Sequence, residues 1–534
     1  MAFLRTEVVV VGAGPCGVTL ANHLGLHGIS TLLIDRSPDV LDYPRAVGVD
    51  DEALRSWQTV GLASKLIADM VQNPPVRYHN SRGQCFACIR PAAQPYGWPR
   101  RNMFLQPLTE ATLRAGLERY PHVSCRYGTE LVALKQDREE AALACRSPDG
   151  SALEIRCRYV VGADGGRSTV RGQIGVELAG ETDVFKWLVV DVENDQLDAA
   201  FSGVYCDPRR PHMAIDLPYG FRRFEFMLLS GDDEQAVQSP EHLARLMQPH
   251  YPDGVPLPRV KRSRVYLHHS RIAQKFRVGR VFLAGDAAHL QPPFFGQGMN
   301  SGLRDATNLG WKLAAVLRGQ LPDDALDSYE TERRDHALAM VNFATWIGRM
   351  YRPYNHVSER LRDLFFSAVQ AMPSIREYIL QLRFKPMPKY TRGLVLGRGH
   401  RSLGTMFMQP RVECRDGEQR KLDDAVGPGF CVLGVNVDPA QYLCEADRAF
   451  WKRLGATVVQ VNRSRAGAHL NAHTDPATIV LDDIEGRFRD WLDDNAPHDV
   501  IVLRPDRYVA AVCRHQDLCA TTEDYRRVIG ATPT

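Results

Sequence analysis

The feature that most constrains the fold is a glycine-rich turn near the start of the chain. Residues 7–11 read EVVVV, an apolar run typical of a strand buried on both faces, and GAGPCG (12–17) follows at once. Gly12 permits a tight turn, Gly14 lets the main chain approach a pyrophosphate, and Gly17 lets the following helix pack closely on the strand. This order of elements predicts a Rossmann-like unit that binds a dinucleotide at a helix N-terminus.

An acidic residue completes the unit. A second predicted strand, STLLID, ends at Asp35, where a carboxylate can accept hydrogen bonds from ribose hydroxyls. An acidic side chain at this position disfavours a 2′-phosphate, so FAD and NAD fit the unit and NADP does not. The unit alone does not distinguish FAD from NAD.

Two later segments make that distinction. YVVGADGGRSTVR reads as a strand that ends just before Asp164, and VFLAGDAAH as another that ends just before Asp286. Ligands bind at the C-terminal ends of strands in α/β sheets, so Asp286 can accept a ribityl hydroxyl. Gly296 and Gly298 then open a predicted helix whose first amides can face a flavin ring. One extended FAD therefore accounts for both glycine-rich stretches.

Together, GAGPCG, GADGGRSTVR and GDAAHLQPP resemble the single-component flavin aromatic hydroxylases, the p-hydroxybenzoate hydroxylase-like family. The resemblance implies an α/β fold in which a Rossmann-like FAD domain carries an inserted β-sheet substrate domain. LDYPRAVGVDDEAL, GWPRRNMFLQP, RRFEFML, RFKPMP and VLRPDRYVAAV are similar to one subgroup, the 3-(3-hydroxyphenyl)propionate/3-hydroxycinnamate hydroxylases. Fingerprint and resemblance together give the expected cofactor-binding residues: Gly12, Gly14, Pro15, Gly17, Asp35, Arg36, Arg45, Gln106, Asp164, Gly285, Asp286, Pro293, Gly296, Gly298, Met299 and Asn300.

The same resemblance implies an activity. The subgroup hydroxylates a phenolic arylpropionate ortho to its hydroxyl, giving a catechol through a C4a-hydroperoxyflavin, with NADH (or NADPH) as a transient electron donor and O2 as co-substrate. Phe295 and Met299 depart from the subgroup's loop pattern beside the flavin, so we expect them to contact substrate. A hydroxylase of a resorcinol-like or alkylphenol-like substrate, a flavin-dependent halogenase, a dithiol reductase and a flavin-loaded interaction module stay open as alternatives.

Candidate residues for the phenol chemistry come from less specific signals. His289 follows the Gly-Asp pair, His212 lies in a predicted strand of the substrate sheet, and Tyr219 is a third candidate for activating the phenol. A substrate carboxylate calls for an arginine, which binds it bidentately. The alternating strand GFRRFEFMLL offers Arg222 and Arg223, of which one is expected to face inward.

Composition narrows the partners. A formal net charge of +3 gives no reason to expect a nucleic-acid partner, and the chain has neither a long apolar run for a membrane span nor a secretory signal pattern. The 12 cysteines are scattered without the spacing of a metal site, so we expect no metal and reduced thiols in a cytoplasmic enzyme. A small phenolic substrate is the expected partner, and a homodimer stays open.

The pattern of predicted elements suggests four parts. The tail alternates strands and helices and ends in two strands and a helix, which resembles the thioredoxin-like domain of phenol hydroxylases; it lacks a CxxC after its first strand, so we expect a packing role. The expected parts are an FAD-binding domain (1–73, 103–180 and 275–345), a substrate domain (74–102 and 181–274), a helical connection (346–400) and the thioredoxin-like domain (401–534).

Overall fold

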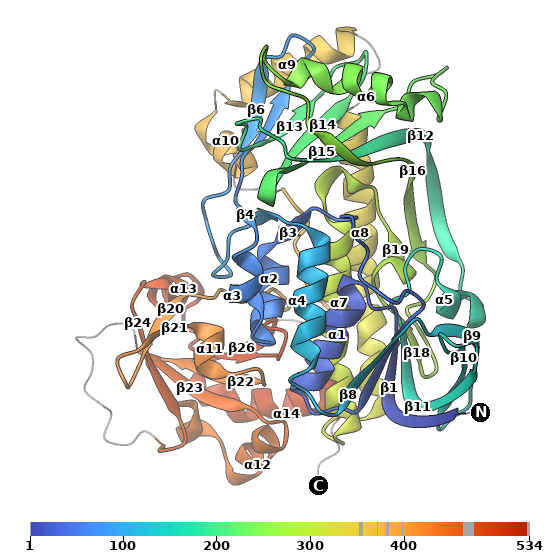
Figure 1. The fold of residues 1–534 in the computed structure, drawn as a ribbon. Coiled ribbons are helices and arrows are strands. Elements are labelled where there is room, and N and C mark those ends of the chain that lie inside the picture. Colours follow the sequence, from blue (N-terminus) through green and yellow to red (C-terminus); the bar gives the residue numbers. More distant parts are fainter. Residues whose placement is uncertain are drawn as a thin grey trace.

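Three large β-sheets organise the chain (Figure 1). The computed structural model describes residues 2–351, 356–370, 372–380, 384–397, 399–462 and 475–530. In Figure 1 the second large sheet lies at the top, the N-terminal sheet at the lower right, helices that pack on it in the centre, and the orange and red C-terminal domain at the lower left. No helix among the described residues combines the length and the apolar character needed to cross a bilayer.

The first sheet is the predicted Rossmann-like core. Its strand order is β17-β18-β11-β1-β2-β8, with β10 and β9 continuing from β11, and β1 is parallel to both β11 and β2. The helix α1 packs against both α4 and α7. The bounds are β1 Ala2–Val11, β2 Thr31–Asp35, β8 Val123–Tyr127, β9 Glu130–Gln136, β10 Ala141–Arg146, β11 Ala152–Gly162, β17 Arg277–Val278, β18 Val281–Leu283, α1 Pro15–Leu26, α4 Gln106–Leu117, α5 Thr169–Gln173 and α7 Gly298–Leu317.

Glycines in the first turn are required by close main-chain contacts. Gly12 has a φ of +108°, and a Cβ there would lie 2.4 Å from the carbonyl oxygen of Ala163. A Cβ at Gly17 would lie 1.9 Å from the carbonyl oxygen of Gly12. The turn therefore seats α1 directly against the ends of β1 and β11, as the sequence predicts.

A small sheet joins the first large sheet to the second. Its order is β3-β7-β4, and α2 begins directly after β3. Asp50 caps α2, because its carboxylate accepts a hydrogen bond from the main-chain N–H of Ala53. The bounds are β3 Gly48–Asp50, β4 Val71–Gln72, β7 Arg101–Met103, α2 Asp51–Thr59 and α3 Ala63–Ile67.

The second sheet has the order β19-β16-β12-β15-β14-β13-β5-β6 and is antiparallel except between β13 and β5. The paired strands β12 and β16 are long and run down the right side of Figure 1 towards the first sheet. Apolar side chains lie on both faces, with α6 covering one and α8, α9 and α10 contributing to the other. The bounds are β5 Val76–His79, β6 Cys85–Ile89, β12 Leu178–Glu193, β13 Ser202–Tyr205, β14 His212–Leu217, β15 Phe221–Met227, β16 Arg259–Ala273, β19 His289–Leu290, α6 Pro240–Met247, α8 Asp327–Tyr351, α9 His356–Gln370 and α10 Pro373–Leu380.

The C-terminal domain is an α/β domain, as predicted. Its strand order is β21-β20-β24-β23-β22-β25-β26, and the predicted order of strands and helices is present with β20, β21 and β24 in addition. The bounds are β20 Arg411–Cys414, β21 Gln419–Lys421, β22 Cys431–Val435, β23 Thr457–Asn462, β24 Ile479–Asp483, β25 Val500–Leu503, β26 Val509–Cys513, α11 Leu422–Val426, α12 Glu445–Arg453, α13 Arg487–Asn495 and α14 Leu518–Val528.

Buried ion pairs fix this domain to the N-terminal part. Arg504 donates hydrogen bonds to both carboxylate oxygens of Glu332 on α8, at 2.7 and 2.8 Å. Arg55 on α2 does the same to Asp423 on α11, at 2.6 and 2.9 Å. Removing one partner of such a pair leaves a buried charge without its counter-ion, so these contacts hold the two parts in one arrangement.

Candidate active site

A pocket of about 470 Å³ lies between the first and second sheets. One side, the glycine wall, consists of residues 14–16, 45–49, 285–286 and 296–300. The other side, the sheet wall, consists of side chains on one face of the second sheet: Val76, Tyr78, Ile89, Val189, Val204, Met213, Ile215, Arg223 and Glu225. Both glycine-rich stretches of the sequence therefore open on the same pocket.

Two helix N-termini meet at the glycine wall. The N-cap of α1 is Gly14 and that of α7 is Gln297, and no side chain caps either helix. The first amides of a helix lack partners within the helix and favour negative charge. The wall is therefore suited to a ligand with a pyrophosphate at one end and an electron-rich ring at the other.

The glycines of this wall leave room for a ligand to touch the main chain. A Cβ at Gly14, Gly165 or Gly296 would meet no protein atom within 4 Å. Asp35 ends β2 close to the turn, where its carboxylate accepts a hydrogen bond from the main-chain N–H of Ala13 at 2.6 Å. The open space at Gly14 fits the pyrophosphate of FAD, the open space at Gly296 fits its flavin end, and the position of Asp35 fits its ribose.

The pocket collects most of the expected cofactor-binding residues. Gly14, Pro15, Arg45, Gln106, Gly285, Asp286, Pro293, Gly296, Gly298, Met299 and Asn300 line it. Gly12, Gly17, Asp35, Arg36 and Asp164 are not among its lining residues. Asp164 instead supports the start of the short helix α5, whose N-cap is Ser168, since its carboxylate accepts hydrogen bonds from the Ser168 hydroxyl and the Val170 N–H.

Side-chain amides hold the loops of the glycine wall in place. The Gln106 carbonyl accepts hydrogen bonds from the main-chain N–H groups of Arg45 and Ala46, at 3.1 and 2.7 Å. Asn300 accepts one from the Asp50 N–H and donates to the carbonyls of Gly48 and Gly296. Both residues therefore shape the loop before β3, which carries Arg45 to within 3.8 Å of Asp286.

His289 lies beneath the glycine wall and not in the pocket. Its side chain is fully buried, and Nε2 lies 2.7 Å from Asp305 Oδ2, which also accepts a hydrogen bond from the Gly285 N–H. Burial alone would raise the pKa of Asp305, but His289 and Arg333 outweigh it and keep that pKa below its ordinary value. The predicted contact of His289 with a phenol is therefore not present; the residue supports the turn at Gly285.

Alternation along β14 and β15 explains why two other candidates face away. Arg223 lines the pocket, whereas Arg222 lies on the opposite face of the sheet, where it pairs with Asp195 at 2.5 Å. His212 shares that opposite face and stacks on Tyr205 with ring centroids 4.5 Å apart. Neither His212 nor Arg222 is among the residues that line the pocket, because each is an odd number of residues away from the inward positions.

Tyr219 is also remote from the pocket. Its side chain is 62% exposed in the turn between β14 and β15, and its hydroxyl donates a hydrogen bond to Asp69. The predicted role of Tyr219 in phenol activation is therefore not supported by its position. Met299 lines the pocket as expected, whereas Phe295 lies in the short helix Pro293–Phe295 and its side chain is not described.

One acidic residue of the sheet wall was not singled out from the sequence. Glu225 is buried between Val189 and Met213, its partners on the neighbouring strands, and its Oε2 has no hydrogen-bond partner among the described residues. Burial raises the pKa of this carboxyl, and Arg223, 3.9 Å away, lowers it by less. Period-two alternation could have found it, since Glu225 is two residues from Arg223.

A buried charge cluster lies where the two walls meet. Arg304 on α7 donates hydrogen bonds to Asp50 and Glu52, and the ammonium of Lys385 lies 2.8 Å from Asp50. Burial raises the pKa of the neighbouring Asp51 to about 7, and the charge of Asp50 adds to that effect. Lys385, which the sequence reading did not select, therefore brings a cation from the connecting segment to the pocket edge.

The chain was compared with known families and structures. Residues 5–344 match the FAD binding domain family, and residues 404–528 match the HcaD C-terminal domain family. The chain is 48% identical to the 3-(3-hydroxy-phenyl)propionate/3-hydroxycinnamic acid hydroxylase of Burkholderia cenocepacia (strain HI2424), covering 95% of this chain and 94% of that one. The enzyme of the same name from Mycobacterium avium (strain 104) is 44% identical, covering 97% and 92%.

A solved structure supports the fold. The flavin-dependent monooxygenase PieE, crystallised with FAD and substrate, superposes with a TM-score of 0.83 over 99% of this chain and 100% of that chain, at 20% identity. At that identity the likeness concerns the fold alone. The two family matches and the end-to-end identity carry the assignment: the chain belongs to the FAD-binding aromatic hydroxylases, the flavin-dependent monooxygenases that include the 3-(3-hydroxyphenyl)propionate/3-hydroxycinnamic acid hydroxylases.

Proposed function

We propose that this monooxygenase hydroxylates a phenolic arylpropionate, such as 3-(3-hydroxyphenyl)propionate, ortho to its hydroxyl. The reaction consumes the phenol, O2, NADH and a proton, and yields a catechol, NAD⁺ and water. The names of relatives that are up to 48% identical over nearly the whole chain support this substrate class. The observation within the pocket that carries the proposal is a single buried carboxyl, Glu225, on an otherwise apolar part of the sheet wall.

The apolar part of the sheet wall suits an aromatic ring. Val189, Met213 and Ile215 line the pocket from neighbouring strands, and Phe294 lines it from the loop before α7. Such side chains exclude water from the ring, which matters because water diverts the activated oxygen to hydrogen peroxide. Bound FAD, once reduced, supplies the activated oxygen, and the protein's task is to hold the phenol beside it.

Glu225 is suited to activating the phenol. In the proposed complex the phenol O–H donates a hydrogen bond to Glu225 Oε2, and the ionised carboxylate draws the proton from the hydroxyl as the ring attacks oxygen. Burial raises the pKa of Glu225 from that of an ordinary glutamate, which brings it closer to neutral pH. A base is most effective when its pKa lies near the working pH.

Two arginines on one side of Glu225 are suited to the substrate's carboxylate. Arg223 is held by Asp191 on its Nε and Nη2 atoms, and by the carbonyls of Pro44 and Arg45. Arg262 lines the same pocket, with its guanidinium over the Tyr43 ring and Nη1 4.0 Å from Asp191. Asp191 and an ionised Glu225 balance these two cations, so we propose that the pair binds the propionate through guanidinium N–H groups that are not already in use.

Spacing within the second sheet supports this arrangement. Glu225 and Arg223 are two residues apart on β15, and Arg223 Nη1 lies 3.9 Å from Glu225 Oε1. Arg262 lies on β16, which β12 separates from β15, so roughly 10 Å lie between the two strands. The phenol hydroxyl of one arylpropionate can therefore reach Glu225 while its carboxylate reaches Arg262.

A panel of meta-substituted phenols, with and without a propionate chain, tests the proposal. NADH oxidation, oxygen uptake and catechol formation are measured together for each compound. We expect the arylpropionates to give the highest kcat/KM and catechol equal to the NADH consumed. A higher kcat/KM for a resorcinol or an alkylphenol would overturn the substrate class, and hydrogen peroxide as the only product from an arylpropionate would do the same.

A further inference from the structure

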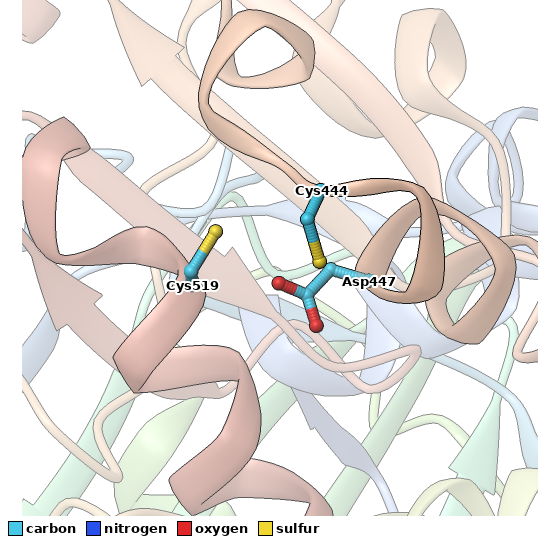
Figure 2. A group of neighbouring side chains, drawn as sticks. All are labelled: Cys444, Asp447 and Cys519. Carbon is cyan, nitrogen blue, oxygen red and sulfur yellow. The ribbon is translucent and has the colours of Figure 1, made fainter. Parts of the chain in front are cut away.

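Two thiols and one carboxylate converge in the C-terminal domain, far from the pocket (Figure 2). Cys444 is the N-cap of α12, Asp447 lies in the first turn of that helix, and Cys519 lies in the first turn of α14. Their ligand atoms all lie within 4.8 Å of one another. Within the described part of the chain, this is the one group of three such residues that could hold a metal ion.

The contacts that these side chains already make leave the cluster available. Cys444 is exposed and makes no capping hydrogen bond with its thiol. The Cys519 thiol donates to the carbonyl of Tyr442 at 2.9 Å, and Asp447 is buried beside Arg526, whose Nη2 lies 2.7 Å from Oδ1. Figure 2 shows the two sulfur atoms and the carboxylate turned toward one another. Among the ion pairs of the described residues, the one that ties a member of the cluster to an opposite charge is Asp447–Arg526.

The charges of the cluster suit a divalent cation. Two thiolates and Asp447 carry three negative charges, and Arg526, which also pairs with Glu523, offsets at most one of them. At least two negative charges therefore face one divalent ion. Cys444 and Cys519 each sit at the start of a helix. Arg526 would keep its hydrogen bond to the Asp447 carboxylate, because carboxylates that bind metal ions are commonly hydrogen-bonded by neighbouring groups.

We propose that Cys444, Asp447 and Cys519 bind one zinc-class divalent cation. Binding displaces a proton from each thiol, forms two metal–sulfur bonds and one metal–oxygen bond, and releases both protons to solvent. Two sulfurs with one oxygen select a borderline or soft ion such as Zn²⁺ or Cd²⁺ over Mg²⁺ or Ca²⁺. The exposed side of Cys444 leaves a fourth position for water.

The consequence is a link between two helices that are distant in sequence. The indole of Trp451 on α12 already donates a hydrogen bond to Thr522 on α14, and its ring stacks on Tyr525. A metal ion would join the first turns of the same helices. Because these packing contacts exist without it, the ion stabilises a folded domain and is not required for folding.

The test uses the full FAD-loaded enzyme, freed of metal by a chelator and kept reduced. Titration with Cd²⁺ alone is followed by the ultraviolet charge-transfer band of cadmium–thiolate bonds, and Zn²⁺ is then added as competitor. We expect one Cd²⁺ per chain and displacement by Zn²⁺. Cys444→Ser, at an exposed position, should weaken binding by at least the ~100-fold that loss of a partner around a metal ligand can cost.

A matched control separates this site from adventitious thiol binding. Cys414→Ser removes another half-buried thiol of the same domain and should leave the titration unchanged. The flavin spectrum reports that each variant stays folded and loaded. Three results would each overturn the proposal. The wild type could show no cadmium–thiolate band, Cys444→Ser could bind as much Cd²⁺ per chain as the wild type, or Cys414→Ser could lose binding to the same extent as Cys444→Ser. A Cys444–Cys519 disulfide in the reduced, chelated enzyme would also overturn it.

Discussion

The glycine wall and the sheet wall of the pocket present different parts of their residues to a ligand. At the glycine wall the exposed groups are main-chain amides of Gly14 and of the start of α7, and the side chains of Gln106 and Asn300 are engaged in holding loops. At the sheet wall the groups that line the pocket are side chains, among them the largely buried Glu225 and Arg223. The first wall suits a ligand shared by a whole family, and the second can change its specificity one side chain at a time.

The largest expected effect concerns the sheet wall. Glu225→Gln keeps the shape of the side chain but cannot take a proton, so kcat for an arylpropionate should fall by about 10²- to 10⁴-fold, the range for general-base catalysis. In the wild type, kcat/KM should decline at acid pH as Glu225 protonates through its raised pKa, and this decline should be absent from the variant. Stopped reactions analysed for catechol across a pH series measure both effects.

The control for this comparison is Glu193→Gln on the adjacent strand β12. Glu193 pairs with Arg259 and does not line the pocket, so this variant should keep the wild-type rate and pH profile. If Glu225→Gln retained the wild-type rate and pH profile, another group would have to activate the phenol, and the sheet wall would only bind the aromatic ring.

The second prediction concerns the glycine wall. A methyl group at Gly14 would meet no protein atom, so Gly14→Ala should fold normally, but its Cβ would enter the space expected for the pyrophosphate. Loss of one hydrogen bond to a charged group costs about 1.5–3 kcal/mol. The dissociation constant for FAD should therefore rise by about 10- to 150-fold. Fluorescence titration of the apoenzyme with FAD measures it.

Gly172→Ala provides the matched control, since a Cβ there would also meet no protein atom and the residue lies in α5, away from the pocket. It should bind FAD as the wild type does. Equal FAD affinity in Gly14→Ala would show that the main chain of the first turn does not approach the pyrophosphate.

The difference between the walls also explains which parts of the site can be predicted from the sequence. EVVVV-GAGPCG predicts the first turn because a main constraint on it is local: a Cβ at Gly17 would collide with the carbonyl oxygen of Gly12, five residues earlier. The strands of the second sheet are equally readable from alternation. The alternation of side chains along β15 predicts that Arg222 and Arg223 lie on opposite faces of the second sheet, but it does not predict which face lines the pocket. That choice depends on how the second sheet is placed against the first.

Residues that act through distant contacts are the ones the sequence could not identify. His289 is adjacent to the Gly-Asp pair in sequence, yet its position is set by Asp305 in α7. Lys385 reaches the pocket from the RFKPMP segment, in which no local pattern marks the lysine as a pocket residue, and Cys444 meets Cys519 only through the packing of α12 on α14. Each of these depends on tertiary packing between elements, which no local pattern encodes.

A third prediction separates the two neighbouring arginines of β15. Arg223→Lys loses the bidentate pair with Asp191 and the contacts with the carbonyls of Pro44 and Arg45. KM for an arylpropionate should rise about tenfold, and KM for a simple phenol should rise less, because only the former carries a carboxylate. Steady-state kinetics on both substrates, with FAD in excess, measures the ratio.

Arg222→Lys is the counterpart on the opposite face. It weakens the buried pair with Asp195, so the free energy of unfolding should fall while both KM values stay unchanged. Equal increases of KM for both substrates in Arg223→Lys would contradict a carboxylate contact and would leave Arg223 with the task of holding the loop at Pro44.

The smallest effect on activity is expected where the two walls meet, and the change there is one of stability. The folded pKa of Asp51 is about 7, above its ordinary value, because the carboxyl is buried close to Asp50 and Glu52 despite the cations Lys385 and Arg100. A folded pKa above the unfolded one favours the folded state at low pH, and this advantage is lost as pH rises from about 4 to about 7. Asp51→Asn stays neutral throughout and should remove that pH dependence.

Urea unfolding of the FAD-loaded enzyme across this pH range tests the prediction. The wild type should lose about 4 kcal/mol more of its unfolding free energy than Asp51→Asn as pH rises, because the pKa of Asp51 is raised from 3.8 to about 7. Asp424→Asn, at an exposed carboxylate on α11, should follow the wild-type curve. Parallel curves for wild type and Asp51→Asn would mean that Asp51 is ionised in the folded enzyme throughout, with the cations of the cluster outweighing its burial. The junction of the two walls would then carry a full additional negative charge beside the pocket at every pH tested.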